Sequence, residues 1–130
     1  MPTPPPSRIA MPELTVFSRQ SPAPEYDRPR PERLLEGNPL RTTHEHFAAP
    51  RGDLTAGVWA CEPGAWRIAF GENKDEFFCI IEGRVRIADS DGNAAEFGPG
   101  EAGVIPAGFS GSFTVLEAVR KHYVVLERAD

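Results

Sequence analysis

Two glutamates four residues apart are the strongest chemical signal in this sequence. Glu72 and Glu76 lie in the segment from Phe70 to Gly83, and every second residue of an extended strand faces the same side, unless a turn around Asn73 breaks the register. Two carboxylates on one face repel each other, so a cation must join them or one must hold a proton. Glu76 is the first candidate for a catalytic acid or base, because burial without a partner favours its protonated form. The alternative is a strand-end glutamate that is solvated or paired with Lys74 or Arg67.

The three histidines offer further candidates. His122 follows Arg120 and Lys121, where a structural role and a role as a catalytic base facing Glu76 both fit. The sequence does not determine which face of the strand His122 occupies, because both alternating sets of residues that follow it are apolar: Tyr123 with Val125, and Val124 with Leu126. His44 and His46 form a His-x-His pair, but no glutamate follows at metal-site spacing. A polar strand or loop is the simpler interpretation of this pair, and a ligand pair over the barrel mouth is the alternative.

Composition excludes several classes of protein. A chain of 130 residues has room for one domain with a single core. Its formal net charge of −5 argues against a nucleic-acid partner, which needs a basic face. The longest apolar run, Phe77 to Ile81, is far too short for a transmembrane helix, so we expect no membrane association. Since no signal-peptide pattern opens the chain, we expect a cytoplasmic protein whose two cysteines, Cys61 and Cys79, are unpaired.

The chain from Leu54 onward has the pattern of many short strands. Segments rich in Val, Ile and aromatic residues alternate with Gly, Pro or Asp, as in Glu62-Pro63-Gly64 and Asp91-Gly92. No long segment with helical periodicity competes with them. The predicted strands are residues 54–62, 65–70, 76–81, 84–88, 95–97, 103–105, 112–119 and 121–127. Such a series predicts an all-β sandwich or barrel.

The first 39 residues carry ten of the fourteen prolines. Proline lacks the backbone donor, so this stretch can be neither a long helix nor a central strand. We predict an extended, partly flexible Pro-rich N-terminal arm over residues 1–33, followed by a barrel domain over residues 34–130. Within this region, residues 14–17 could dock as a short edge strand, and residues 33–36 could form one helical turn.

Two glycine-punctuated segments, Phe70 to Gly83 and Gly100 to Val115, resemble the two sequence motifs of the cupin superfamily. The matching positions are Glu76, Gly83, Gly100, Pro106 and Gly108. The motif histidines and asparagine are absent, and their places hold Phe70, Glu72, Gly111 and Val115. Further glycines and prolines between residues 31 and 127 resemble the branch with (S)-ureidoglycine aminohydrolase-type and ethanolamine-utilisation cupin domains. This resemblance implies a small single-domain cupin, an RmlC-like jelly-roll β-barrel.

The resemblance also implies that Glu76 points into the barrel, and strand alternation then defines the rest of the lining. The predicted cavity is mostly aromatic, with carboxylates near its mouth. The expected ligand-binding residues are Glu72, Trp59, Trp66, Phe70, Phe78 and Phe113. For Trp59 and Trp66, a core or interface role competes with a flat wall that stacks on a planar or carboxylate ligand, with Arg67 or Lys121 nearby.

Relatives of the ureidoglycine aminohydrolase type bind manganese through a glutamate, two histidines and a glutamine. No imidazole remains at the corresponding places here, so we expect neither the usual cupin metal centre nor another cofactor. Two carboxylates alone would suit a hard ion such as Mg²⁺ or Mn²⁺, and only weakly.

Three functions fit the sequence. The first is a metal-poor cupin that binds a small molecule in its barrel. The second is an enzyme acting on a small polar or nitrogen-containing acid, with Glu76 as acid or base and manganese as an optional aid. The third is a structural or interaction module whose barrel is filled by side chains. Residues 77–81 are apolar on both faces, which favours a homodimer with the N-terminal arm crossing to the partner.

Overall fold

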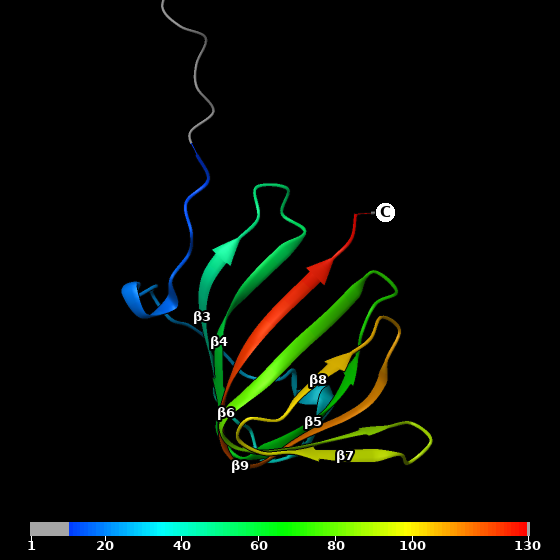
Figure 1. The fold of residues 1–130 in the computed structure, drawn as a ribbon. Coiled ribbons are helices and arrows are strands. Elements are labelled where there is room, and N and C mark those ends of the chain that lie inside the picture. The colour runs from blue at the N-terminus through cyan, green and yellow to red at the C-terminus, as the bar shows by residue number, and fades with distance from the viewer. Residues whose placement is uncertain (1–10, 130) are drawn as a thin grey trace, which may run out of the picture.

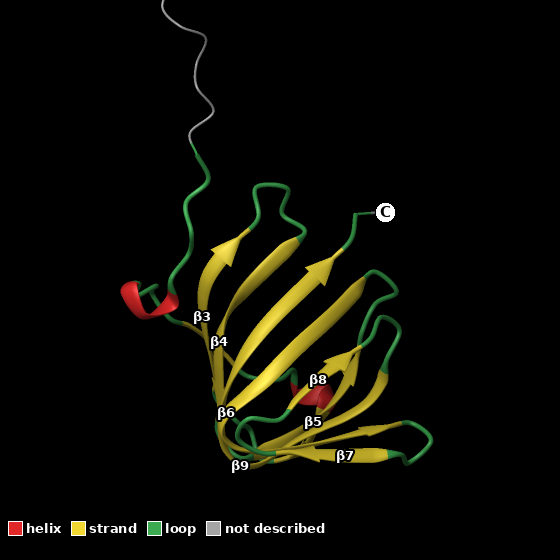
Figure 2. Cartoon of the chain, in the orientation of Figure 1, coloured by secondary structure: helices red, strands yellow, loops and turns green. Residues whose placement is uncertain are grey.

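The computed structural model describes residues 11–129, and these residues form an almost entirely β fold. The strands are β1 (Glu25–Asp27), β2 (Leu34–Glu36), β3 (Arg41–Ala48), β4 (Leu54–Cys61), β5 (Gly64–Ala69), β6 (Lys74–Asp89), β7 (Ala94–Phe97), β8 (Ala102–Ile105) and β9 (Ser110–Glu127). Two short 3₁₀ helices, η1 (Phe17–Arg19) and η2 (Pro31–Arg33), precede most of them (Figure 2). In the described part of the chain, no helix has the length and apolar character needed to cross a membrane.

All strands belong to one antiparallel sheet that curls on itself (Figure 1). The main path runs β1-β3-β4-β9-β5-β2, and β6 pairs with β7, β8 and β9. One half of β9 lies between β6 and β4, and its other half lies between β6 and β5. The two longest strands therefore run through both halves of the barrel. The all-β jelly roll expected from the sequence is confirmed.

A bulge at Gly83 bends β6 between the two halves. The register of β6 against β9 shifts on both sides of this residue. Gly83 has a φ angle of 87°, and a Cβ there would lie 2.1 Å from the carbonyl oxygen of Ala118. Only glycine tolerates both the left-handed backbone and this close approach. The two strands predicted over residues 76–81 and 84–88 are therefore a single bent strand.

The core lies where β5, β6 and β9 enclose the interior of the barrel. Its buried members are Cys61, Trp66, Phe78, Ile80, Val85, Ile87, Ile105, Phe113, Val115 and Val119. Cys61 and Cys79 are both unpaired, as predicted. Burial raises the pKa of the Cys61 thiol to about 12, so this group is a neutral part of the core at physiological pH.

The N-terminal segment differs in part from the prediction, and the expectations for residues 1–10 lie outside the described residues. Residues 14–17 do not form an edge strand, because the chain enters η1 at Phe17, whose ring stacks on His46. The turn expected at residues 33–36 is also wrong. Pro31 starts η2 two residues earlier, and β2 follows directly. β1 pairs with β3, so the sheet begins before residue 34.

Candidate functional site

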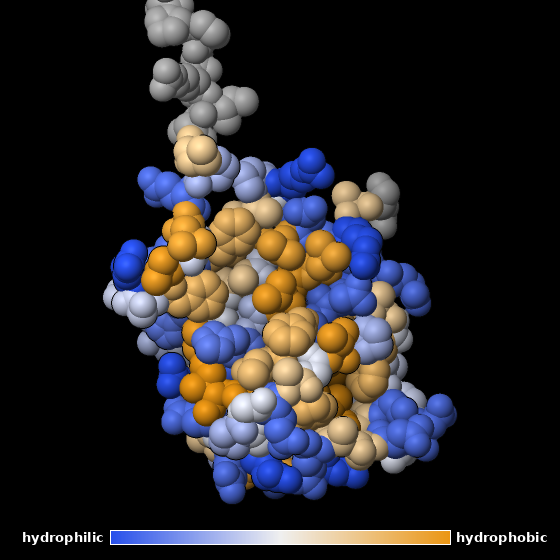
Figure 3. Space-filling model, viewed as in Figure 1, coloured by the Kyte–Doolittle hydropathy of each residue, from blue (hydrophilic) through white to orange (hydrophobic). Residues whose placement is uncertain are grey.

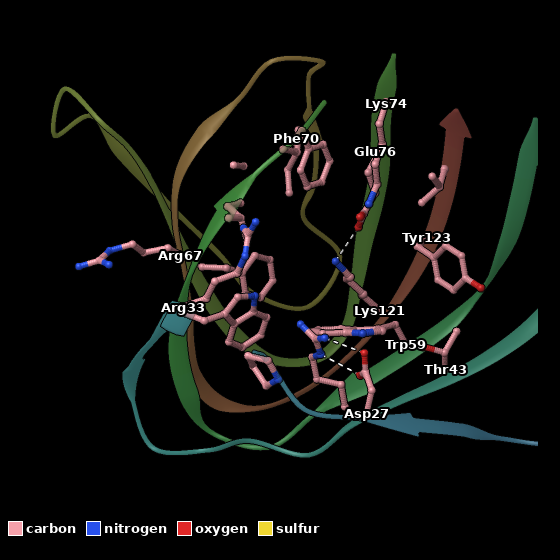
Figure 4. A pocket seen from close by; sticks show the side chains of 18 of the residues that line it. Asp27, Arg33, Thr43, Trp59, Arg67, Phe70, Lys74, Glu76, Lys121 and Tyr123 are labelled. Atoms are coloured by element: carbon pink, nitrogen blue, oxygen red, sulfur yellow. Dashed lines mark hydrogen bonds and ion pairs between the residues drawn. The ribbon is translucent and has the colours of Figure 1, made fainter. Parts of the chain in front are cut away.

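A cavity of about 630 Å³ lies inside the curled sheet (Figure 4). Its walls come from β3, β4, β5, β6, β8 and β9, from residues 27–33 and from Phe70. The charged residues that line it are Arg30, Arg33, Arg41, Arg67, Lys74 and Lys121 on the positive side and Asp27, Glu45 and Glu76 on the negative side. Of the labelled cations, Arg67 points away from the cavity (Figure 4). The lining is thus rich in positive charge, although the whole chain has a net charge of −5.

An ion pair between Lys121 and Glu76 lies within this cavity (Figure 4). Lys121 Nζ is 2.6 Å from Glu76 Oε2, and the side chains are only 5% and 13% exposed. Adjacent strands β9 and β6 bring them to the same inward face. The alternative interpretation of Glu76 as a glutamate that is solvated or paired with Lys74 or Arg67 named the wrong partner, because strand alternation turns Lys121 inward toward it. The hypothesis of a proton-transferring Glu76 assumed an unpaired carboxylate, and this pairing removes that support.

Aromatic rings surround the Lys121 ammonium. Its Nζ lies 4.5 Å from the ring centroid of Trp59, 5.0 Å from that of Phe113 and 5.1 Å from that of Phe78. The negative faces of aromatic rings attract a cation, and the attraction grows where water is excluded. The rings therefore help to keep a positive charge inside the barrel.

Trp66 holds a second cation. The Arg41 guanidinium lies 5.4 Å from the centre of its ring and donates to both carboxylate oxygens of Asp27, at 2.9 and 2.6 Å. Phe113 stacks on Trp66 at 5.2 Å, and Trp66 is only 5% exposed. This packing favours the core role of Trp66 over a stacking wall for a ligand.

The structure brings together five of the residues expected at the site and separates the others. Trp59, Trp66, Phe70, Phe113 and Glu76 line the cavity. Phe78 lies beneath Lys121 in the core, edge-on to Phe97. Glu72 is exposed, and its carboxylate packs against Gly108 instead of facing Glu76. The expectation that Glu72 and Glu76 share one face is therefore wrong. A turn, in which the Lys74 amide donates to the Gly71 carbonyl, interrupts the alternation of side chains along the strand.

His122 lies on the outer face of the sheet, where His44 and Val58 align with it across the strands. Its neighbours in sequence, Lys121 and Tyr123, line the cavity. The hypothesis that His122 is a catalytic base facing Glu76 is therefore wrong, because adjacent residues of β9 point to opposite sides of the sheet. His46 belongs to the same outer group. Its pKa is lowered, first by burial and then by the nearby His44 and His122.

Sequence reasoning placed Lys121 only beside a possible stacking wall, as an alternative to Arg67, and missed Tyr123 as a lining residue. The only sequence signal for Lys121 was the short basic cluster of residues 120–122, which did not indicate a face. Tyr123 is 7% exposed, and burial raises the pKa of its phenol to about 12, with Glu45 and Glu76 adding to the shift. The phenol is therefore a neutral hydrogen-bonding group at physiological pH.

The side chains around Glu76 do not fit the metal centre that other cupins carry. Glu76 is neutralised by Lys121 and Asp27 by Arg41, and the histidines lie on the opposite face of the sheet. Within residues 11–129, no three His, Cys, Asp or Glu side chains are grouped so that they could hold a metal ion. An ammonium stands beside Glu76 at the place where such a centre would need further donors.

We therefore expect the purified full-length protein to contain no stoichiometric manganese, iron, nickel or zinc. Imidazole suits iron, nickel and zinc, and no histidine side chain of the described residues reaches the cavity. Manganese accepts carboxylate oxygens, but Glu76 and Asp27 of the cavity are each paired with a cationic side chain. Elemental analysis by mass spectrometry, on protein from cells grown with added metal salts, measures this directly. About one such metal per chain would contradict the expectation.

The curled antiparallel barrel, with a glutamate of β6 directed into its cavity, is that of a cupin. A family model described as the EutQ-like cupin domain matches residues 48–123, more than half of the 130 residues. The chain belongs to this EutQ-like cupin family. The resemblance to ethanolamine-utilisation cupins is thereby confirmed, whereas the relation to ureidoglycine aminohydrolase-type enzymes stays a prediction.

Several solved structures share the fold. A DUF861-family protein of unknown function from Pseudomonas syringae pv. tomato is 25% identical, with a TM-score of 0.70 over 79% of this chain and 43% of its own. The EutQ protein of Clostridium difficile is 24% identical, with a TM-score of 0.60 over 68% and 64%. A putative ethanolamine utilization protein EutQ from Salmonella typhimurium is 16% identical, with a TM-score of 0.59 over 85% and 100%. No curated protein matches the chain.

This chain spans less than two thirds of the Pseudomonas and Clostridium proteins, at 43% and 64% of their lengths. At the identities of the two EutQ proteins, the likeness concerns the fold alone. The chemistry of the cavity must therefore be argued from its own side chains.

Proposed function

We propose that this cupin binds a small organic anion in its barrel, through cationic side chains in place of a metal ion. The observation that carries the proposal is the surplus of positive side chains lining a 630 Å³ cavity of an acidic chain. Low-dielectric walls focus such a field and concentrate ligands of opposite charge. The volume lies within the usual range for small-molecule sites and argues against a barrel filled by side chains.

Several of these cations are available to a ligand. Among residues 11–129, Arg30, Arg33 and Lys74 form no ion pair with another side chain. Lys74 lies over the ring of Phe70, at 4.5 Å from its centroid. Charge-assisted hydrogen bonds from such groups to a carboxylate are among the stronger polar contacts in proteins.

Lys121 and Glu76 form the inner end of the site. An ammonium has three donors, and the single hydrogen bond of Lys121 within the described residues goes to Glu76. A carboxylate entering the cavity could therefore accept from Lys121, while Glu76 accepts from a donor of the same molecule. This arrangement favours an acid that also carries an amide, amine or hydroxyl group.

Isothermal titration calorimetry with matched probes tests the proposal. We expect benzoate and succinate to bind the full chain at low ionic strength, and the neutral benzamide and succinamide to bind far more weakly. Removal of a contacting cation in Arg33→Met or Lys74→Met should weaken anion binding about tenfold, the loss of one charge-assisted hydrogen bond.

The control is Arg86→Gln, which removes an exposed cation outside the cavity lining and should leave binding unchanged. Added salt should weaken anion binding, because it screens the lining charges. Equal affinity for acids and amides, or no binding of either acid at millimolar concentration, would count against an anion site.

A further inference from the structure

Lys121 is a buried amine that has a carboxylate in direct contact with it. The chain contains two lysines, Lys74 and Lys121, and both line the cavity. The Lys121 side chain is 5% exposed, and its Nζ lies 2.6 Å from Glu76 Oε2. Lys74 is half-buried over the Phe70 ring and forms no ion pair among residues 11–129. The two amines therefore share one cavity, and Lys121 has an ion-pair partner to take up its proton.

Lys121 is reached from the inside of the barrel. The outer side of the same strands is covered: Figure 3 shows apolar side chains gathered over the middle of the face that β4, β9, β6 and β8 present to the viewer. The next residue, His122, belongs to that outer side, whereas Lys121 lines the cavity. A molecule that contacts this amine must first enter the cavity, where the positive lining favours anions.

We infer that Lys121 forms an imine with the carbonyl group of a small oxo acid, a carboxylate that also carries an aldehyde or a ketone. This inference rests on the proposed anion site: outer cations such as Arg33 hold the carboxylate, and the carbonyl end reaches Lys121. A lysine in a hydrophobic pocket, with a base within hydrogen-bonding reach, has the arrangement that activates an amine to attack a carbonyl carbon.

Glu76 carries out the proton transfers of this reaction. It takes one proton from the Lys121 ammonium along their hydrogen bond, and the nitrogen lone pair then attacks the carbonyl carbon. A proton moves from nitrogen to the former carbonyl oxygen, which gives a neutral carbinolamine. Glu76 returns its proton to this hydroxyl group, which leaves as water while the nitrogen lone pair forms the C=N bond. An ammonium and a carbonyl compound thus give an iminium ion and one water, without an oxidant or a reductant. Because the proton stays within the ion pair, an unpaired Glu76 is not required.

The surroundings of Lys121 suit the iminium ion as well as the ammonium. Both carry a single positive charge on the same nitrogen, so Glu76 remains the counter-ion and no unpaired charge is left inside the barrel. The rings of Trp59, Phe113 and Phe78 lie 4.5, 5.0 and 5.1 Å from Lys121 Nζ and attract either cation. Since this nitrogen is almost fully buried, the rings also limit the water that would hydrolyse the imine.

Reductive trapping tests this inference on the full-length protein at neutral pH. Cyanoborohydride reduces an imine to a stable secondary amine, and mass spectrometry of proteolytic peptides assigns each adduct to Lys121, Lys74 or the chain terminus. We expect glyoxylate and succinic semialdehyde to label Lys121 about a hundredfold faster than Lys74, the usual gain from a positioned proton acceptor. Butyraldehyde, the analogue of succinic semialdehyde with a methyl group in place of the carboxylate, should label Lys121 far more slowly. Absence of a Lys121 adduct with both oxo acids, or equal rates at the two lysines, overturns the imine.

The variant Glu76→Gln tests the role of the carboxylate. Trapping at Lys121 should become about a hundredfold slower, provided that circular dichroism shows the β-sheet spectrum of the unmodified protein. Unchanged or faster trapping, as expected if Glu76 only keeps the amine protonated, overturns this role. The comparison of Lys121 with Lys74 uses the unmodified protein, so it decides on the imine even if the variant does not fold.

Calorimetry with succinate distinguishes failure of the imine from failure of the anion site. If succinate binds while neither oxo acid labels Lys121, the imine alone is overturned and the anion site stands. If butyraldehyde labels Lys121 as fast as succinic semialdehyde does, Lys121 is the reactive amine, but selection of a carboxylate by the lining cations is overturned.

Discussion

Replacement of Lys121 by methionine is expected to lower the free energy of unfolding by about 3–5 kcal/mol, the usual loss when one partner of a buried ion pair is removed. The variant leaves the Glu76 carboxylate, which is 13% exposed, without the ammonium that now lies 2.6 Å from it. Urea unfolding followed by tryptophan fluorescence measures the change. Trp59 reports directly on this position, because its ring lies 4.5 Å from Lys121 Nζ.

The double variant Lys121→Met with Glu76→Met distinguishes the cost of an unpaired Glu76 carboxylate from the cost of lost side-chain packing. Two apolar side chains of similar volume should restore most of the stability, because neither leaves a buried charge behind. Lys74→Met is the matched control. Lys74 is the other lysine of the chain, and its loss should cost less than about 1 kcal/mol, because this half-buried side chain forms no ion pair within the described residues and its removal leaves no carboxylate without a partner. If Lys121→Met costs no more than Lys74→Met, the ion pair does not have the strength that its burial implies.

Gly83→Ala is expected to cost about 3 kcal/mol or more, from backbone strain of about 1–3 kcal/mol together with a steric clash. The new Cβ would lie 2.1 Å from the Ala118 carbonyl oxygen and 2.7 Å from the Val119 Cα atom. Since both neighbours are backbone atoms of β9, relief requires a shift of the pairing. The melting temperature should fall by roughly 10 °C, at about 3–5 °C for each kcal/mol in a domain of this size.

The variant Gly92→Ala is the control that distinguishes the cost of backbone strain from the cost of the steric clash in Gly83→Ala. Gly92 has a φ angle of 90°, close to the 87° of Gly83, but an added Cβ meets nothing within 4 Å. Gly92→Ala should therefore show the strain alone, a smaller loss. Equal losses for the two variants would mean that the bulge tolerates a methyl group and does not fix the bend of β6.

The fold could be predicted from the residue types of short segments, and the site could be predicted in this way only in part. Strands are defined by β-branched residues and by turn pairs such as Asp91-Gly92, which lie only a few positions apart in the chain. The sequence alone therefore predicted most of the strands. Gly83 was recognisable from the family motif, because its backbone conformation excludes other residues. By contrast, η1 and the single long strands depend on contacts between segments far apart in the chain.

The partner of Glu76 could not be predicted, because it depends on which side of β9 faces inward. Residues 123–126 are apolar at both parities, so alternation alone did not assign Lys121 to the cavity and His122 to the outside. Pairing with β4 and β6 decides the question. Glu72 was misplaced for a similar reason, since the turn at residues 71–73 resets the alternation that an uninterrupted strand would have continued.

The continuity of β6 and β9 through both halves of the barrel has a mechanical consequence. No hinge line can run between the halves without breaking the hydrogen bonds of one of these strands, so the walls cannot swing apart to admit a molecule. A ligand must instead fit an opening whose width the paired strands fix, and only side chains that line it, such as Arg30, Arg33 and Lys74, can adjust to the molecule. The sheet then acts as a rigid frame, and the choice among ligands depends on the side chains that the frame holds in place.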